Sequence, residues 1–135
     1  PTFKLPIKKQ RCLIIADGYY EWLNTDQGKQ AYYIYYNDNR LFAFAGIWDA
    51  WNKKEEKIYS FSILTKKSQG EISNIHHRMP VILNREHERE WIADIKEPQI
   101  RDIIKSSSEK NLTYHSVSKR VNSARNNDKT LINSI

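Results

Sequence analysis

The stretch Arg11-Cys-Leu-Ile-Ile-Ala-Asp-Gly-Tyr-Tyr-Glu-Trp22 holds two strand-like runs separated by an Asp17-Gly18 turn. The first run is apolar, and the second carries a carboxylate, Glu21, between two aromatic residues. Side chains alternate between the faces of a strand, so Glu21 shares a face with Tyr19 and Leu23 and not with its direct neighbours. The stretch predicts a fold built on strands and tight turns.

Similar runs, rich in aromatic and β-branched residues, recur along the chain. Residues 30–36 and 41–48 flank a polar turn, and we predict that they pair as a hairpin. Residues 52–57 are charged and are predicted to form a loop. The pattern indicates an α+β fold, strand-dominated, with a curled or barrel-like and mostly antiparallel sheet. The predicted strands are 11–16, 18–24, 30–36, 41–48, 57–65, 79–83 and 112–117.

Helical signals are few. Residues 1–10 contain two prolines and predict an extended lead-in. Asn84 can cap a helix that runs to about residue 95, with glutamates favourably placed near its start. Pro98 suits the first turn of a second short helix, with Ile100 and Ile103 on one face. We therefore expect a few short helices beside the sheet, all within a single domain spanning residues 1–135.

The chain is basic and rich in aromatic residues. Its 22 Lys and Arg exceed its 16 Asp and Glu, for a formal net charge of +6, and 12% of its 135 residues are aromatic. Single-stranded nucleic acid is held by phosphate contacts and base stacking, which need cationic and aromatic side chains together. The composition favours such a partner, although many basic domains bind no polyanion.

No apolar run approaches the roughly 20 residues that cross a bilayer. With no signal segment either, the sequence predicts a cytoplasmic, nucleoid-associated protein without a membrane partner. Its one cysteine, Cys12, rules out an internal disulfide and is expected to be a buried structural thiol. Metal-ligand spacing, a glycine-rich phosphate loop and a nucleophile elbow are all missing from the sequence, so we expect no metal or cofactor.

Glu21 is the first candidate for chemistry. A carboxylate held among aromatic rings loses hydration, which raises its pKa and suits it to proton transfer near neutral pH. The alternative interpretation is an ordinary surface glutamate on an edge strand.

A second candidate set lies in residues 75–83. If this segment is extended, His76 and Arg78 share a face, and Pro80 favours extended backbone before it. An imidazole would then stand beside a guanidinium suited to phosphate, with His77 pointing away. The alternative is a solvated basic loop. Later in the chain lie Lys119, Arg120 and Arg125. They indicate either further phosphate contacts or a solvated C-terminal loop.

These stretches occur in an order and spacing that resemble the SOS response-associated peptidase (SRAP) family over nearly the whole chain. The resembling motifs are residues 11–22, 44–48, 61–65 and 75–83, followed by Val117-Ser118 and Val121-Asn122.

The resemblance implies a protein that binds single-stranded DNA and captures abasic sites covalently. In the family, an N-terminal cysteine, freed by autoproteolytic removal of the initiator Met, closes a thiazolidine with the aldehyde of the ring-opened sugar. Glu21 takes the place of the family's catalytic glutamate, a proton shuttle. His76 takes the place of its catalytic histidine, which assists sugar ring opening and crosslink reversal. Arg78 would bind DNA phosphate, and Trp22 would shape the pocket.

One departure from the family pattern concerns the nucleophile. The family's cysteine precedes the region seen here, and Cys12 cannot replace it because an internal cysteine has no free α-amine. We therefore expect these residues to be the C-terminal portion of the domain, with apolar edges that a partner chain or self-association would cover. The alternative function is a non-catalytic single-stranded DNA-binding module or a degenerate family remnant. An in-frame Met-Cys-Gly start upstream would favour the enzyme.

Overall fold

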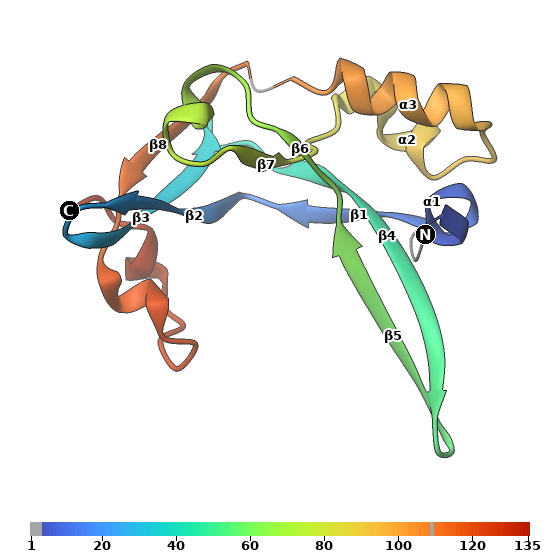
Figure 1. Ribbon diagram of the computed structural model, residues 1–135, viewed down its shortest axis with the longest axis horizontal. Helices are drawn as coiled ribbons and strands as arrows, with labels where there is room; N and C mark the ends of the chain where they lie inside the picture. Colours follow the sequence, from blue (N-terminus) through green and yellow to red (C-terminus); the bar gives the residue numbers. More distant parts are fainter. Residues whose placement is uncertain (1–3, 109) are drawn as a thin grey trace. The chain divides into compact units, whose positions relative to one another are not determined.

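The computed structural model describes residues 4–108 and 110–135, which form two compact units (Figure 1). Unit 1 comprises the described residues of Pro1–Ala16, Phe42–Lys66 and Pro80–Ser108. Unit 2 comprises those of Asp17–Leu41, Lys67–Met79 and Glu109–Ile135.

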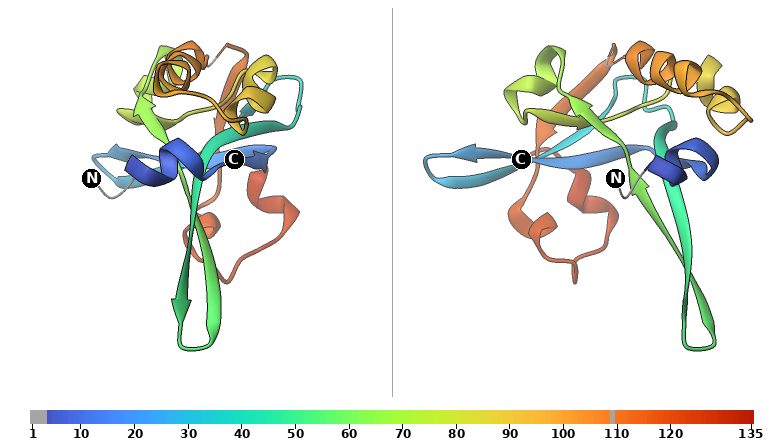
Figure 2. Two further views of the ribbon diagram at one scale, coloured as in Figure 1. Left: turned by 90° about the vertical axis from the view of Figure 1, so that its right-hand side faces the viewer. Right: turned by 45° about the vertical axis from the view of Figure 1, so that its right-hand side comes forward.

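Unit 1 is built on a three-stranded antiparallel sheet in the order β1-β4-β5. Its strands are β1 (Arg11–Ala16), β4 (Phe42–Lys53) and β5 (Glu56–Ile63). The first half of β4 pairs with β1, and its second half continues with β5 as a long twisted hairpin (Figure 2). The unit also contains helices α1 (Lys4–Lys9), α2 (Glu88–Trp91) and α3 (Glu97–Ser106), with a 3₁₀ turn, η2 (Arg85–His87).

Trp91 is at the centre of the unit 1 core. Its side chain is fully buried among apolar residues from β1, β4 and α3. The indole Nε1 donates to the carbonyl oxygens of Cys12 at 3.1 Å and Gly46 at 3.3 Å, so its one polar group is satisfied. The buried face of α3 contributes Ile100 and Ile103. This core fixes the helices against one face of the sheet.

Unit 2 is built on a second antiparallel sheet, in the order β2-β3-β8. Its strands are β2 (Gly18–Thr25), β3 (Gly28–Tyr36) and β8 (Leu112–Ser116), and its 3₁₀ turns are η1 (Gly70–Asn74), η3 (Lys119–Asn122) and η4 (Lys129–Ile132). Ile72, Ile75 and Met79 pack on one face around Ile34. Aromatic rings from β2 and β3 pack with Val117 and Val121 on the other.

The turn between β1 and β2 depends on a close approach at Gly18. A Cβ atom at this position would lie 2.4 Å from the ring of Tyr33, which is directly across the strand pair from Tyr20. Any side chain would displace that ring. The glycine of the Asp17-Gly18 turn therefore allows the tyrosine to pack over the start of β2.

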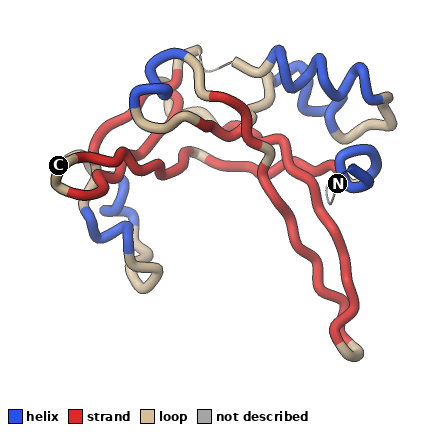
Figure 3. The backbone as a smooth tube through the Cα atoms, in the orientation of Figure 1, coloured by secondary structure: helices blue, strands red, loops and turns tan. Residues whose placement is uncertain are grey.

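The predicted fold class is confirmed. Strands account for 44% of the described residues, the helices are short, and the antiparallel sheets are open and do not close into a barrel (Figure 3). A two-stranded sheet of β6 (Thr65–Lys67) and β7 (Arg78–Pro80) completes the described strands. No helix in residues 4–108 and 110–135 is long and apolar enough to cross a membrane.

The extended lead-in was wrong, because residues 4–9 form α1. Pro6 lies in the first turn of this helix, where the backbone N–H that proline lacks would have no intrahelical partner. Residues 1–3 of that prediction lie outside the described residues.

Asn84 immediately precedes η2, at the position predicted for a helix cap. Its side chain does not cap the turn, however, because its amide donates to the Ser106 carbonyl at 2.8 Å. Pro98 lies in the first turn of α3, as predicted.

The predicted hairpin of residues 30–36 and 41–48 was also wrong. These strands are β3 and β4, and they belong to different sheets. The hairpins that form instead are β2–β3 and β4–β5, each closed by a two-residue turn. Residues 52–57 are accordingly mostly strand, since Asn52 pairs with Lys57 and Lys53 with Glu56. Only Lys54 and Glu55 form the turn, with Lys54 at a φ of 57°.

Candidate functional site

A cavity of about 530 Å³ lies at the β2 edge of the unit 2 sheet. It is formed by the outer strand β2, the start of β3, the segment before β7, and η3. Two groups that can transfer protons, Glu21 and His76, line the same cavity. The other lining residues are Trp22, Asn24, Lys29, Val121, Asn122 and Ala124.

Glu21 and Trp22 approach this cavity from opposite faces of β2. Glu21 is opposite Tyr32 on β3, and Trp22 is opposite Ala31, so their side chains leave the sheet in opposite directions. The carboxylate Oε1 of Glu21 accepts a hydrogen bond from the Trp22 backbone N–H at 3.0 Å. The bond holds the carboxylate close to the backbone of the edge strand.

The ring of His76 is held by the backbone of Arg78. Its Nδ1 lies 3.1 Å from the Arg78 amide nitrogen, which donates to it, and 3.1 Å from the Arg78 carbonyl oxygen. Nδ1 accepts from the amide when it is unprotonated and donates to the carbonyl oxygen when it is protonated, so the two contacts are alternatives. Because either contact occupies Nδ1, Nε2 is the ring nitrogen left for proton exchange with a molecule in the cavity. A half-buried imidazole fixed in this way is suited to act as a general acid or base.

The sequence predicted that His77 points away from His76, but the rings of the two residues lie against each other. The two rings are in contact, with centroids 4.4 Å apart and planes tilted by 30°. The reason is that β7 begins at Arg78, so the two-residue alternation of a strand does not extend back to the histidines. His77 is exposed and is not among the cavity's lining residues.

Trp22 connects the edge strand to the segment after β8. Its Nε1 donates to the side-chain oxygen of Asn122 at 2.7 Å, and its ring belongs to the cluster that contains Val121. This contact places η3 at one wall of the cavity. Sequence reasoning identified Trp22 but not Asn122.

We expect Trp22→Phe to loosen this wall while keeping the ring. Losing one hydrogen bond costs about 1 kcal/mol, which corresponds to about fivefold in a local opening equilibrium. Amide hydrogen exchange of residues 119–124 should accelerate by about that factor, whereas exchange in β3 should not change. Equal exchange in both proteins would show that the bond does not hold η3.

Lys29 is a lining residue that sequence reasoning missed. The β2–β3 register places it opposite Asn24, near the end of the hairpin and within reach of the carboxylate-bearing strand. Lys29 also lines a second cavity, of about 410 Å³, together with Lys119. Two cations therefore flank the space next to the Glu21–His76 cavity. Only the two-residue turn of the β2–β3 hairpin could have suggested Lys29, because the turn fixes its register.

The arginines that were predicted to contact phosphate differ in their surroundings. Arg78 is exposed at the start of β7 and Arg125 in the loop after η3, and neither is among the lining residues of the first cavity. The guanidinium of Arg120 pairs with Asp128 at 2.8 Å and donates to Thr130 at 3.1 Å. Hydrogen bonds from Thr130, followed by the Arg120 interaction, lower the pKa of Asp128. Arg120 thus ties η3 to η4.

Tyr19 lies on the Glu21 face but is a poor acid near neutral pH. Burial, followed by the charge of Glu21, raises the pKa of its phenol well above the usual value. Within the described residues, no group of three or more His, Cys, Asp and Glu side chains could hold a metal ion. Glu21 and His76 therefore stand beside the Lys29 ammonium as the titratable side chains that line the cavity.

Comparison with known proteins places this arrangement in a family. The model of the SOS response associated peptidase (SRAP) family matches residues 1–124. The abasic site processing protein YoqW of Bacillus subtilis (strain 168) is 36% identical over 138 residues, covering 99% of this chain and 62% of that protein. The abasic site processing protein HMCES of Gallus gallus is 36% identical over 147 residues, covering 93% of this chain and 44% of that protein.

A solved structure shares the fold. The crystal structure of a protein from Bacteroides thetaiotaomicron superimposes with a TM-score of 0.90 at 31% identity, covering 100% of this chain and 61% of that one. The chain therefore spans about half to three fifths of the length of the relatives that it matches.

Proposed function

The chain belongs to the SOS response associated peptidase family, and we propose that it takes part in processing abasic sites in single-stranded DNA. The observation that carries the proposal is that Glu21 and His76 line one cavity, although 54 residues separate them in the sequence. The relatives are named abasic site processing proteins, and these names support abasic sites as the substrate.

The size and lining of the cavity suit a sugar that has lost its base. A volume of about 530 Å³ falls in the usual range for small-ligand sites, about 300–1,000 Å³. Trp22 supplies an aromatic wall, and Lys29 supplies a positive charge for an adjacent phosphate. The names of the relatives single out the deoxyribose of an abasic site as the proposed ligand.

In the proposed chemistry His76 assists opening of the sugar ring. Opening breaks the bond between C1′ and the ring oxygen, adds a proton to that oxygen and removes one from the C1′ hydroxyl, leaving an aldehyde. A fixed imidazole can carry out one of these transfers and then the other. The same group acts on the reverse path when a crosslink is released.

Glu21 serves as the proton shuttle for capture of the aldehyde. A primary amine adds to C1′, and loss of water from the adduct gives an imine. A thiol then adds to the imine carbon and closes a thiazolidine, so the aminothiol and aldehyde yield the adduct and one water. Glu21 moves protons between the amine and the departing hydroxyl, which its position at the strand edge allows.

We propose that the aminothiol is an N-terminal cysteine, freed by autoproteolytic removal of the initiator Met, as in the family that the sequence resembles. Cys12 does not meet this requirement, because its amine is part of the peptide backbone. Burial also raises the pKa of the Cys12 thiol, which keeps it protonated. Cys12 is half-buried, so the prediction that it is a buried thiol was wrong.

Binding to the single strand should be electrostatic and tolerant of sequence, with Arg78, Lys119 and Arg125 as phosphate contacts. We expect Arg78→Ala to reduce the steepness of log K against log salt by about 0.7, the value for one phosphate contact on a single strand. Fluorescence anisotropy with two unrelated oligonucleotides measures this slope. Arg85→Ala, which removes the same charge from η2 in unit 1, should leave the slope unchanged. Equal slopes for Arg78→Ala and the wild type would remove Arg78 from the phosphate-binding role.

A further inference from the structure

The polar side chains that line the Glu21–His76 cavity come from two faces of the unit 2 sheet. Lys29 lies directly opposite Asn24, so both belong to the face that carries Trp22. We call it the Trp22 face. Glu21 lies on the other face, because successive residues of a strand point to opposite sides. The strand itself would therefore separate an anion on the Trp22 face from the carboxylate of Glu21.

The segments that complete the cavity follow the same division. His76 belongs to the segment before β7, which packs on the face that carries Glu21. Asn122 belongs to η3, which packs on the Trp22 face through Val121. The groups suited to proton transfer thus come from one face, and the amide and ammonium groups come from the other.

The side-chain amide of Asn122 is oriented by Trp22. An indole N–H can only donate, so the atom that it meets at 2.7 Å is the amide oxygen of Asn122. The amide nitrogen keeps two N–H donors, and within residues 4–108 and 110–135 no acceptor is bonded to it. Asn122 is exposed and lines the cavity. It therefore offers oriented donors to a molecule in the cavity.

Lys29 supplies a positive charge to the same face. In the part of the chain that the structure describes, Lys29 is exposed and forms no ion pair. Arg120, by contrast, is already paired with Asp128. An unpaired ammonium beside amide N–H donors suits a phosphate group, whose oxygens are charged and accept several hydrogen bonds. Asn24, opposite Lys29, adds a second side-chain amide.

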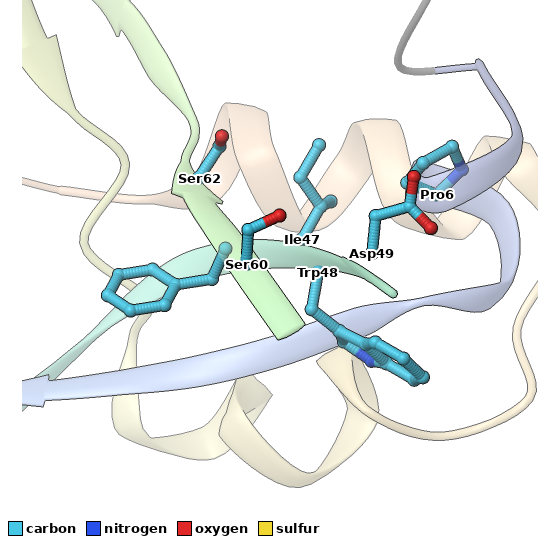
Figure 4. Close-up of a pocket in the computed structure, with 7 residues that line it drawn as sticks. Pro6, Ile47, Trp48, Asp49, Ser60 and Ser62 are labelled. Carbon is cyan, nitrogen blue, oxygen red and sulfur yellow. The ribbon is translucent and has the colours of Figure 1, made fainter. Parts of the chain in front are cut away.

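A cavity in unit 1 offers the opposite kind of lining (Figure 4). Its volume is about 150 Å³, and Asp49 is the charged group among the described residues that line it. Ser60 is directly opposite Asp49, so its hydroxyl lies on the same side of the sheet. A phosphate in this cavity would be repelled by the carboxylate. Of these two cavities, the one beside Trp22 is suited to an anion.

We propose that the Trp22 face of the cavity is a phosphate site formed by Asn24, Lys29 and Asn122. This inference rests on the proposed function, because the phosphate is a phosphodiester next to the abasic sugar. Held on the Trp22 face, the phosphodiester keeps its charge away from Glu21 while the sugar reaches Glu21 and His76. The three residues position the substrate and take no part in the proton transfers.

Asn122→Asp separates this role from that of a wall contact, because aspartate can still accept from Trp22 but has no N–H to donate. The 135-residue chain is titrated into a labelled single-stranded oligonucleotide with a tetrahydrofuran abasic analogue, and fluorescence anisotropy is recorded. We expect the variant to bind about tenfold more weakly, the scale of one hydrogen bond to a charged group. Amide hydrogen exchange of residues 119–124 should not accelerate. Asn52→Asp, the same change at an exposed position in unit 1, should alter affinity less than about twofold.

Neutral linkages identify the phosphate that is bound. Two further oligonucleotides carry a methylphosphonate in place of the phosphodiester, one on the 5′ side of the analogue and one on the 3′ side. With at least one of them the penalty of Asn122→Asp should shrink by about fivefold, because a hydrogen bond to a neutral group is worth less. Lys29→Gln should reduce the steepness of log K against log salt by about 0.7 with the phosphodiester and leave it unchanged with that same methylphosphonate.

Affinity that Asn122→Asp leaves intact would overturn the phosphate site and leave the proposed function standing. A penalty that neither methylphosphonate reduces would overturn it too, since the loss would then come from the cavity wall and not from a phosphate. Failure of the wild-type chain to bind the abasic oligonucleotide would count against the proposed function itself, and the phosphate site would fall with it.

Discussion

His76→Ala should slow covalent capture of abasic single-stranded DNA by about 10²–10⁴-fold, the usual contribution of a general acid or base. The protein for this measurement is a version of the domain extended to the length of its relatives and starting with a cysteine. Capture is followed as a shifted band on a denaturing gel under single-turnover conditions. The loss is expected because Nδ1 of His76 is held by the Arg78 backbone, which leaves Nε2 to exchange protons with the sugar.

Glu21→Gln should produce a loss in the same range. Glutamine keeps the size of the side chain and can still accept the hydrogen bond from the Trp22 backbone N–H. The strand edge should therefore stay intact while proton transfer is lost. Affinity for an unreactive abasic analogue, measured by anisotropy, should change little in either variant.

His77→Ala is the matched control for both variants. It removes an imidazole of the same kind that is exposed and does not line the cavity, although its ring contacts that of His76. We expect a loss of less than about tenfold, the scale of a contact worth about 1 kcal/mol. A larger loss for His77→Ala than for His76→Ala would reassign the catalytic imidazole.

The 135-residue chain assayed by itself should form no heat-stable thiazolidine adduct with abasic DNA. Thiazolidine closure needs an amine and a thiol on the same residue at a free N-terminus, and Cys12 offers only a thiol. A robust adduct that survives heating without a reductant would contradict this expectation. The extended version that begins with cysteine is the positive control.

Borohydride should be included, because an amine can form a reducible imine without a thiol. Pro1, as the first residue of this chain, has a secondary amine, and Lys29 has a primary amine at the cavity. Any borohydride-dependent adduct that persists in Lys29→Ala derives from another amine. An adduct that appears only with borohydride is a reduced imine, so it would not contradict the prediction that no thiazolidine forms.

The strand positions could be predicted from sequence because their signal is local. The apolar run of β1 and the aromatic runs of β3 and β4 each predict a strand from their own residues, whichever strand they pair with. Pairing is not local. β3 and β4 follow each other across a polar turn, yet β3 joins β2 and β8 while β4 joins β1 and β5. Nothing in the sequence of the connecting turn indicates that β3 and β4 belong to different sheets.

The candidate site was predictable to the same extent. Glu21, Trp22 and His76 belong to motifs, and the fold brings all three to one cavity. Lys29 belongs to no motif and reaches the cavity through the cross-strand register of β2 and β3. Asn122 belongs to a resembling motif, but its place in the cavity depends on the hydrogen bond from Trp22. The contact between the His77 and His76 rings could not be predicted from the sequence, because it depends on β7 beginning at Arg78 and not earlier.

The most direct test of the central claim is to map where an abasic strand lies on this chain. A single-stranded oligonucleotide with a tetrahydrofuran abasic analogue and a neighbouring 5-iodouracil is photocrosslinked to the 135-residue chain, and the modified peptides are identified by mass spectrometry. The proposal predicts adducts in residues 19–29 or 75–79, which contain Trp22 and His76. Adducts confined to the β4–β5 hairpin, whose exposed aromatic rings are equally reactive, would contradict it.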